Sequence, residues 1–280
     1  MRTASGRTGR QLAWEEYGDP AGVPVVLLHG TPGGRLGAAP RDGLFAELGL
    51  RVLATDRAGY GGSEPSRGRT VLSHADDVLD VLDAVRVQQA FVVGGSGGGP
   101  HALAVGVAAP ERVRAVGVLV GAVPLLPGEI AGQVAFNQQA LAVLHDEEQL
   151  RKHVDRGRAV VLEDGIEGLL ADAPAIDRAA RADVADALAV AFGDALAPGA
   201  EGWVDDYFAL WRDPWGFAPE DVSVPVLWAH GTLDLNVPYA AARRLADRLP
   251  HGELITWDDV GHAVTPDLLA DFFRRLIGTR

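Results

Sequence analysis

The stretch FVVGGSGGGPH at residues 91–101 decides the fold, because a short apolar run breaks there into glycines that enclose one serine. Residues 91–93 have the apolar, β-branched character of a buried strand. Pro100 and the alanine-rich run after it are typical of the first turns of a helix. Ser96 is therefore predicted to lie on a tight turn between a strand and a helix.

Gly94, Ser96 and Gly98 match the Gly-x-Ser-x-Gly pattern, in which flanking glycines let the backbone turn tightly and expose the hydroxyl. A side chain at Gly94 or Gly98 is expected to clash with that turn. The turn also directs the Gly97 amide and the positive end of the helix at any negative charge that forms beside Ser96. The alternatives are a linker or a phosphate loop, but a Walker lysine is missing and the dinucleotide-binding spacing matches only loosely.

The composition excludes several other classes of protein. The chain has 280 residues and a net charge of −13, which repels nucleic acids and anionic membranes. It has no cysteine, which excludes disulfides and a thiol nucleophile. We expect a small-molecule substrate, no cofactor and no metal. The N-terminus does not resemble a secretory signal and the longest apolar run is too short to span a bilayer, so we expect a cytoplasmic protein. The oligomeric state stays open.

Strand and helix patterns alternate along much of the chain. After a loose start, strands are predicted at residues 11–17, 23–28, 52–55, 90–93, 113–120, 225–229 and 253–257, and helices at 44–48, 71–85, after Ser96, at 239–249 and at 266–277. The first two strands, joined by a DPAG turn, are expected to form a hairpin. The repeated alternation predicts an α/β fold with a mostly parallel, twisted sheet and helices on both faces.

Between residues 124 and 219 the alternation stops, and the sequence has helical periodicity and is rich in Ala, Asp and Arg. We therefore expect a helical insertion over 124–219 in a core domain made of residues 1–123 and 220–280. The insertion concentrates large aromatic side chains, and Trp203, Tyr207 and Trp211 are its predicted substrate-binding residues. The alternative role for these rings is to pack the insertion onto the sheet.

Ligands of open parallel sheets bind at the carboxyl ends of the strands, and three of these ends carry candidate catalytic side chains. Ser96 follows one strand, Asp234 follows the strand that ends in His-Gly, and His262 lies on the last loop before the last helix. This is the chain order expected for a nucleophile, an acid that orients the base, and the base. Asp258 and Asp259 compete with Asp234 for the role of the acid.

Glycine-rich loops are predicted to form an oxyanion hole. The run HGTPGG can present the Thr31 amide to a developing oxyanion, with the Gly97 amide as its partner. Asp56 and Arg57 are expected to neutralise each other and to anchor their loop. The glycines at 97–99 suggest extra room for a bulky acyl group beside the nucleophile.

Together these motifs resemble the α/β-hydrolase superfamily over nearly the whole chain. The likeness rests on the serine turn, the His29-Gly30 loop, the Asp56-Arg57-x-Gly-Tyr-Gly loop, Asp234 after a His-Gly turn, and His262 after Val260-Gly261. It implies a catalytic triad and makes the insertion the lid, or cap, of that family. Haloalkane dehalogenases and epoxide hydrolases use an aspartate nucleophile, which Ser96 argues against. Proline iminopeptidases usually have HGGPG and a tryptophan after the nucleophile, where this chain has Thr31 and Gly97.

The sequence therefore predicts a serine hydrolase that cleaves a small-molecule carboxylic ester or lactone through an acyl-enzyme. Ser96 attacks, His262 accepts its proton, and Asp234 holds the imidazole in the correct tautomer. Aminopeptidase or amidase, thioesterase, carbon–carbon hydrolase and perhydrolase activities use the same triad and stay open. So does a receptor of this fold that binds its ligand and turns it over slowly or not at all.

Overall fold

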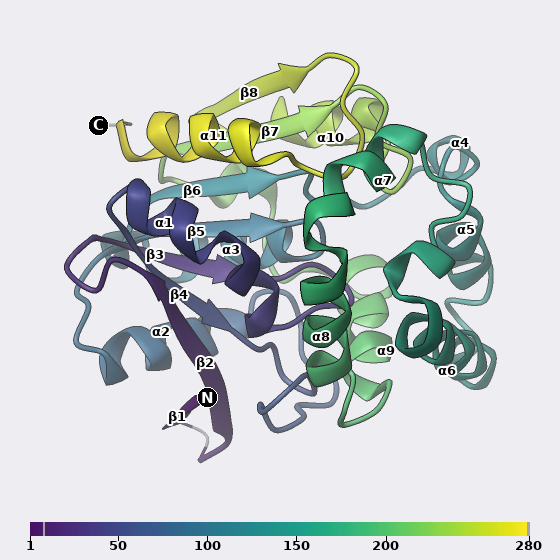
Figure 1. Ribbon diagram of the computed structural model, residues 1–280, viewed down its shortest axis with the longest axis horizontal. Coiled ribbons are helices and arrows are strands. Elements are labelled where there is room, and N and C mark those ends of the chain that lie inside the picture. The colour runs from purple at the N-terminus through teal and green to yellow at the C-terminus, as the bar shows by residue number, and fades with distance from the viewer. Residues whose placement is uncertain (8, 279–280) are drawn as a thin grey trace.

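The chain folds into a mostly parallel sheet covered by helices on both faces (Figure 1). The structure, a computed structural model, describes residues 1–7 and 9–278. The strands are β1 (Arg2–Ser5), β2 (Gln11–Gly18), β3 (Val23–Leu28), β4 (Leu50–Thr55), β5 (Ala90–Gly95), β6 (Val113–Leu119), β7 (Val226–Gly231) and β8 (Gly252–Trp257). Their order in the sheet is β1-β2-β4-β3-β5-β6-β7-β8, and every pair from β4 to β8 is parallel. The predicted fold class is confirmed.

The two faces of the sheet carry separate apolar cores. The helices that follow individual strands are α1 (Asp42–Glu47), α2 (His74–Ala84), α3 (Gly98–Ala108), α10 (Tyr239–Ala246) and α11 (Pro266–Gly278), with 3-10 turns η1 (Arg35–Arg41), η2 (Pro110–Arg112) and η6 (Pro219–Asp221). One core joins α2, α3 and α10 to Val92 of β5, and the other joins α1 and α11 to Val93. Successive strand residues point to opposite faces, so burial on both faces requires the unbroken apolar runs of the sequence.

The hairpin predicted between residues 11–17 and 23–28 does not form. β2 pairs antiparallel with β1 and β4, whereas β3 lies between β4 and β5 and is parallel to both. The run VPVVLL of β3 is apolar throughout and is buried best with neighbours on both sides. β2 carries Glu15 and Glu16 and takes a place nearer the edge. The start of the chain, expected to be loose, forms the edge strand β1.

The described chain between β6 and β7 contains helices and turns and no strand. Its elements are α4 (Pro127–Ile130), α5 (Ala135–Ala142), α6 (Glu147–Asp164), η3 (Ile166–Gly168), α7 (Ala175–Arg181), η4 (Ala182–Val184), α8 (Ala185–Ala195), α9 (Glu201–Tyr207) and the π-helical η5 (Phe208–Arg212). They form a layer beyond the carboxyl ends of the central strands (Figure 1). A third apolar cluster around Trp203 and Tyr207 joins α5, α6, α8 and α9. None of the helices within residues 1–7 and 9–278 is long and apolar enough to cross a membrane.

Candidate active site

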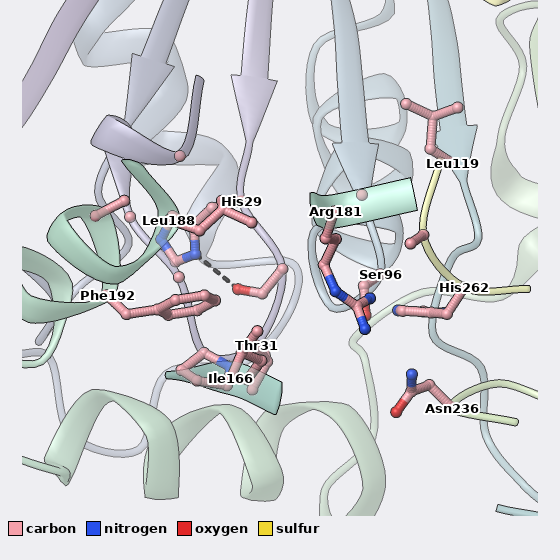
Figure 2. A pocket seen from close by; sticks show the side chains of 18 of the residues that line it. His29, Thr31, Ser96, Leu119, Ile166, Arg181, Leu188, Phe192, Asn236 and His262 are labelled. Carbon is pink, nitrogen blue, oxygen red and sulfur yellow. Dashed lines mark hydrogen bonds between the residues drawn. The ribbon is translucent and has the colours of Figure 1, made fainter. Parts of the chain in front are cut away.

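Ser96 lies on the sharp turn between β5 and α3. Its backbone φ is +51°, a left-handed conformation that costs a residue with a side chain about 1–3 kcal/mol. Neighbouring backbone holds the turn in place. The Ser96 amide donates to Leu119 O at 2.9 Å, and Ser96 O accepts from the amides of Gly99 and Ala122 at 2.9 Å each. The strained backbone is thus fixed from both sides, and the side chain lines a cavity (Figure 2).

The glycines on either side of Ser96 are required by close approaches of backbone. A Cβ at Gly94 would lie 2.1 Å from Gly98 O, inside the turn itself. A Cβ at Gly98 would lie 2.2 Å from Leu28 O, at the end of the neighbouring strand β3. Contacts this short do not occur, so the prediction that neither position tolerates a side chain is confirmed. At Gly98 the obstacle is the adjacent strand rather than the turn.

Thr31 and Gly97, the predicted oxyanion residues, lie against each other. A Cβ at Gly97 would be 2.3 Å from Thr31 Oγ1, and a Cβ at Gly30 would be 3.3 Å from Ser96 Cβ. The loop after β3 therefore passes directly beside the nucleophile. The same packing shows that the extra room expected at 97–99 is absent, because the loop fills the space at 97 and Val118 lies 2.9 Å from a Cβ at 99.

His262 and Asp234 come together from two different strand ends. His262 Nδ1 lies 2.7 Å from Asp234 Oδ2, and the amides of Asn236 and Val237 donate to Oδ1 at 2.8 Å each. Burial by itself would raise the pKa of Asp234, but His262 and His230 beside it hold that pKa well below the usual range. The ionised carboxylate fixes the proton of His262 on Nδ1, which leaves Nε2 able to accept another.

Ser96 and His262 line the same cavity, and Figure 2 shows the His262 ring directed toward the side where Ser96 lies. Among the hydrogen bonds of residues 1–7 and 9–278, none joins Ser96 Oγ to His262. Such contacts often tighten only when a substrate binds. Asp258 and Asp259, the competing acids, are exposed to solvent, and Asp234 occupies the Nδ1 side of the imidazole.

A cavity of about 410 Å³ lies between the strand ends and the helices that precede β7. Its walls are mainly apolar, and Leu119, Ile166, Leu188 and Phe192 are among the side chains that form them (Figure 2). Trp203, Tyr207 and Trp211, the predicted substrate-binding residues, also line the cavity. Trp203 and Tyr207 belong to the third apolar cluster as well, so these rings line the cavity and also pack the helices before β7 against one another.

A buried ionic cluster that the sequence did not predict lies behind the Thr31 loop. Asp206 in α9 accepts hydrogen bonds from Thr31 Oγ1 at 2.6 Å, Tyr60 Oη at 2.9 Å and Arg57 Nη2 at 2.6 Å, and Arg69 Nη2 is 2.8 Å away. Burial by itself would raise the pKa of Asp206, but Arg57 and Arg69 hold it well below the usual range. One carboxylate of α9 therefore fixes the loop that carries Thr31.

The predicted pairing of Asp56 with Arg57 is wrong, because each charge binds a different partner. Asp56 accepts from Arg35 Nη1 at 2.6 Å and from the amides of Arg35 and Gly62 at 2.6 and 2.9 Å, whereas Arg57 binds Asp206. Adjacent residues of extended chain point to opposite sides and do not reach each other. The loop is still anchored, through η1 on one side and α9 on the other.

His29 lines the cavity but is a poor candidate for a second base. Its Nδ1 donates to Gly30 O at 2.7 Å, the bond dashed in Figure 2, and its Nε2 accepts from the Arg57 amide at 3.0 Å. Burial and the neighbouring Arg57 lower the pKa of His29 well below its usual value, so the ring stays neutral. Both nitrogens serve to shape the loop after β3.

The comparisons with known proteins agree with the fold. A family model described as "alpha/beta hydrolase fold" matches residues 23–267. The chain is 31% identical to the non-heme chloroperoxidase of Streptomyces lividans, over 96% of this chain and 99% of that protein.

Solved structures share the fold over nearly the whole chain. The enol-lactonase from Burkholderia xenovorans LB400 superposes with a TM-score of 0.74 at 19% identity, over 99% of this chain and all of the other, and shows a shared fold. A structure described as an N-acyl homoserine lactone degrading enzyme gives a TM-score of 0.69 at 25% identity, over the whole of both chains.

Proposed function

Because this chain belongs to the alpha/beta hydrolase fold family, we propose that it is a serine hydrolase that cleaves a small carboxylic ester or lactone through an acyl-enzyme. The observation that carries the proposal is the 2.7 Å hydrogen bond between His262 Nδ1 and Asp234 Oδ2, beside a cavity that Ser96 also lines. Asp234 and His262 thus meet at the edge of the sheet where Ser96 lines the same cavity, which supports a serine activated by a nearby base.

In the proposed reaction, His262 Nε2 takes the proton of Ser96 Oγ as the oxygen attacks the carbonyl carbon of the substrate. The amides of Gly97 and Thr31 stabilise the oxyanion of the tetrahedral intermediate, aided by the positive end of α3. The intermediate collapses, and His262 returns the proton to the leaving alkoxide. Water, deprotonated by His262, then attacks the acyl-enzyme, and the second intermediate releases the acid as His262 returns the proton to Ser96 Oγ. Asp234 keeps the imidazole in one tautomer throughout.

The helical segment 124–219 acts as the cap in this proposal, since its side chains close the cavity opposite Ser96. A mainly apolar cavity of about 410 Å³ suits a small organic molecule. Trp203, Tyr207 and Trp211 would contact its apolar part. Two solved structures of the same fold are described as lactone-cleaving enzymes, which supports a lactone or a simple ester as the substrate.

The test is hydrolysis of p-nitrophenyl esters of graded acyl length and of γ- and δ-lactones by the purified protein, with Ser96→Ala as the matched variant. We expect kcat to fall by at least about 10⁴-fold in Ser96→Ala with the fold unchanged by circular dichroism. A fluorophosphonate probe should label the wild-type protein stoichiometrically and leave the variant unlabelled. Turnover that survives the substitution would refute the mechanism. Labelling without turnover of any member of the panel would favour a binding protein.

A second candidate is a peroxide-dependent activity, favoured by the 31% identity to the Streptomyces lividans chloroperoxidase over nearly the whole chain. Hydrogen peroxide would replace water in the attack on the acyl-enzyme and release a peracid, with the same Ser96 chemistry. Peracid formed from acetate esters in the presence of peroxide, and lost in Ser96→Ala, would support it. Unchanged yields of carboxylic acid at high peroxide concentration would count against it.

A further inference from the structure

We propose that the natural substrate carries a carboxylate remote from the bond that is cleaved, and that Arg181 of α7 binds this group. The inference rests on the function proposed above and narrows its substrate class. It is drawn from the charges around the cavity and from the hydrogen bonds that Arg181 makes and lacks.

The cavity wall carries positive charge, whereas the protein as a whole is negative. The chain as a whole has a net charge of −13. Among the described residues that line the cavity, however, the fixed charges are those of Arg41 and Arg181, and no Asp or Glu contributes to the wall. A cavity wall that contains two arginines and no carboxylate side chain favours a ligand of negative charge, even though the whole protein is acidic.

Of these two side chains, Arg181 has an unused donor. Its Nε donates to Glu167 at 2.6 Å, which fixes the guanidinium, and Nη2 on the same edge is buried without a hydrogen-bond partner among the described residues, as is Glu167 Oε2. Nη1 makes no hydrogen bond among the described residues and is not buried. Arg41 differs, because its Nη1 binds Asp183 at 3.1 Å, an acid that is more than half exposed. Figure 2 shows the guanidinium of Arg181 extending into the cavity, in the part of the view that holds Ser96 and His262.

The pair with Glu167 uses one edge of the guanidinium and leaves the N–H groups of Nη1 unused. A planar guanidinium with one edge held by Glu167 and a further nitrogen free is arranged to receive a carboxylate. The apolar side chains of the same cavity wall, such as Ile166 and Leu188, would strengthen that interaction by excluding water.

The experiment compares p-nitrophenyl hydrogen glutarate with p-nitrophenyl pentanoate, which have acyl chains of equal length that end in a carboxylate or a methyl group. We expect the wild-type protein to prefer the glutarate in kcat/KM. Arg181→Gln should lower kcat/KM for the glutarate by about 10- to 100-fold and leave the pentanoate nearly unchanged. Arg181→Lys should keep part of the preference. Arg178→Gln removes the same charge from the same helix at a residue outside the cavity wall, and should keep all of it.

The carboxylate could equally belong to the alcohol part of the ester. A second pair, 4-acetoxybenzoate and its neutral methyl ester, places the charge on the leaving group. Preference for the charged member of either pair, lost in Arg181→Gln and kept in Arg178→Gln, supports the inference and identifies the side. Ser96-dependent cleavage of the neutral esters with no preference in either pair, or a preference that survives Arg181→Gln, overturns it and leaves the proposed function standing.

A binding measurement separates the two proposals further. Titration of monomethyl glutarate, which has one free carboxylate, and of neutral methyl pentanoate into Ser96→Ala, followed by calorimetry, requires no turnover. We expect monomethyl glutarate to bind more tightly, and Arg181→Gln in the same background to weaken it by about 10- to 100-fold. If no ester were cleaved but monomethyl glutarate still bound through Arg181, the hydrolase proposal would fail and the anion site would stand. If monomethyl glutarate bound no better than methyl pentanoate, the anion site would be refuted.

Discussion

The Asp206 carboxylate joins α9 to the Thr31 loop and to the loop after β4, and its removal gives a sharp test of how the candidate site is held. Asp206→Asn keeps the size of the side chain but removes its charge. The side chains of Arg57 and Arg69 are 0% and 3% exposed, so neither can turn to water for compensation. Breaking a buried ion pair by removing one partner costs about 3–5 kcal/mol. That is a large part of a typical unfolding free energy of about 5–15 kcal/mol.

Urea unfolding followed by tryptophan fluorescence measures this loss as a lower midpoint. Asp213→Asn is the matched control, because it removes a carboxylate paired with Arg212 that is 36% exposed, and such surface pairs contribute about 0–1 kcal/mol. If Asp206→Asn proves too unstable to purify, Tyr60→Phe removes a single hydrogen bond to the same carboxylate, with an expected loss of about 1.5–3 kcal/mol. An Asp206→Asn midpoint equal to that of the control would refute the reasoning.

The pH dependence of the difference in unfolding free energy between wild type and Asp206→Asn provides an independent check. The pKa of Asp206 is lowered in the folded protein, so its stabilising effect is complete above the unfolded pKa of about 3.9 and is lost as the pH falls through the folded pKa. The gap in unfolding free energy between wild type and Asp206→Asn should stay constant above about pH 5. Below about pH 3.9 it should shrink by about 1.4 kcal/mol per pH unit. A gap that widened in acid would contradict the assignment.

The remaining predictions concern the catalytic geometry. Asp234→Asn should lower kcat for an ester substrate by about 10⁴-fold through the wrong imidazole tautomer, and a loss below tenfold in stopped-flow or steady-state assays would contradict the role of Asp234. Gly97→Ala places a Cβ 2.3 Å from Thr31 Oγ1 and should displace an oxyanion donor, at a cost of about 10²–10³ in kcat with little change in KM. Gly193→Ala, in α8 with open space around the new methyl group, should keep wild-type kinetics and raise the unfolding free energy by about 0.5–1 kcal/mol, as seen in the same urea titration.

The sequence by itself determined the parallel sheet and the candidate triad. Each parallel strand is buried on both faces, so its sequence is an unbroken apolar run. The end of the strand can therefore be located in the sequence, at the first glycine or polar residue after that run. Because the carboxyl ends of parallel strands share one edge, Ser96, Asp234 and His262 could be selected without knowing a single contact. The structure then joined Asp234 to His262 at 2.7 Å.

Only the tertiary structure decided which distant groups meet. β2 pairs with β4 and not with β3, its expected partner. The more apolar strand β3 takes the central place because it gains more free energy from burial there. Arg57 found Asp206, 149 positions further along the chain, rather than its neighbour Asp56. Arg181 reached the cavity from a segment with no strand to set its position. Helical periodicity fixes which face of a helix is apolar, but the place where that face docks follows from packing against the rest of the molecule, which no local pattern encodes.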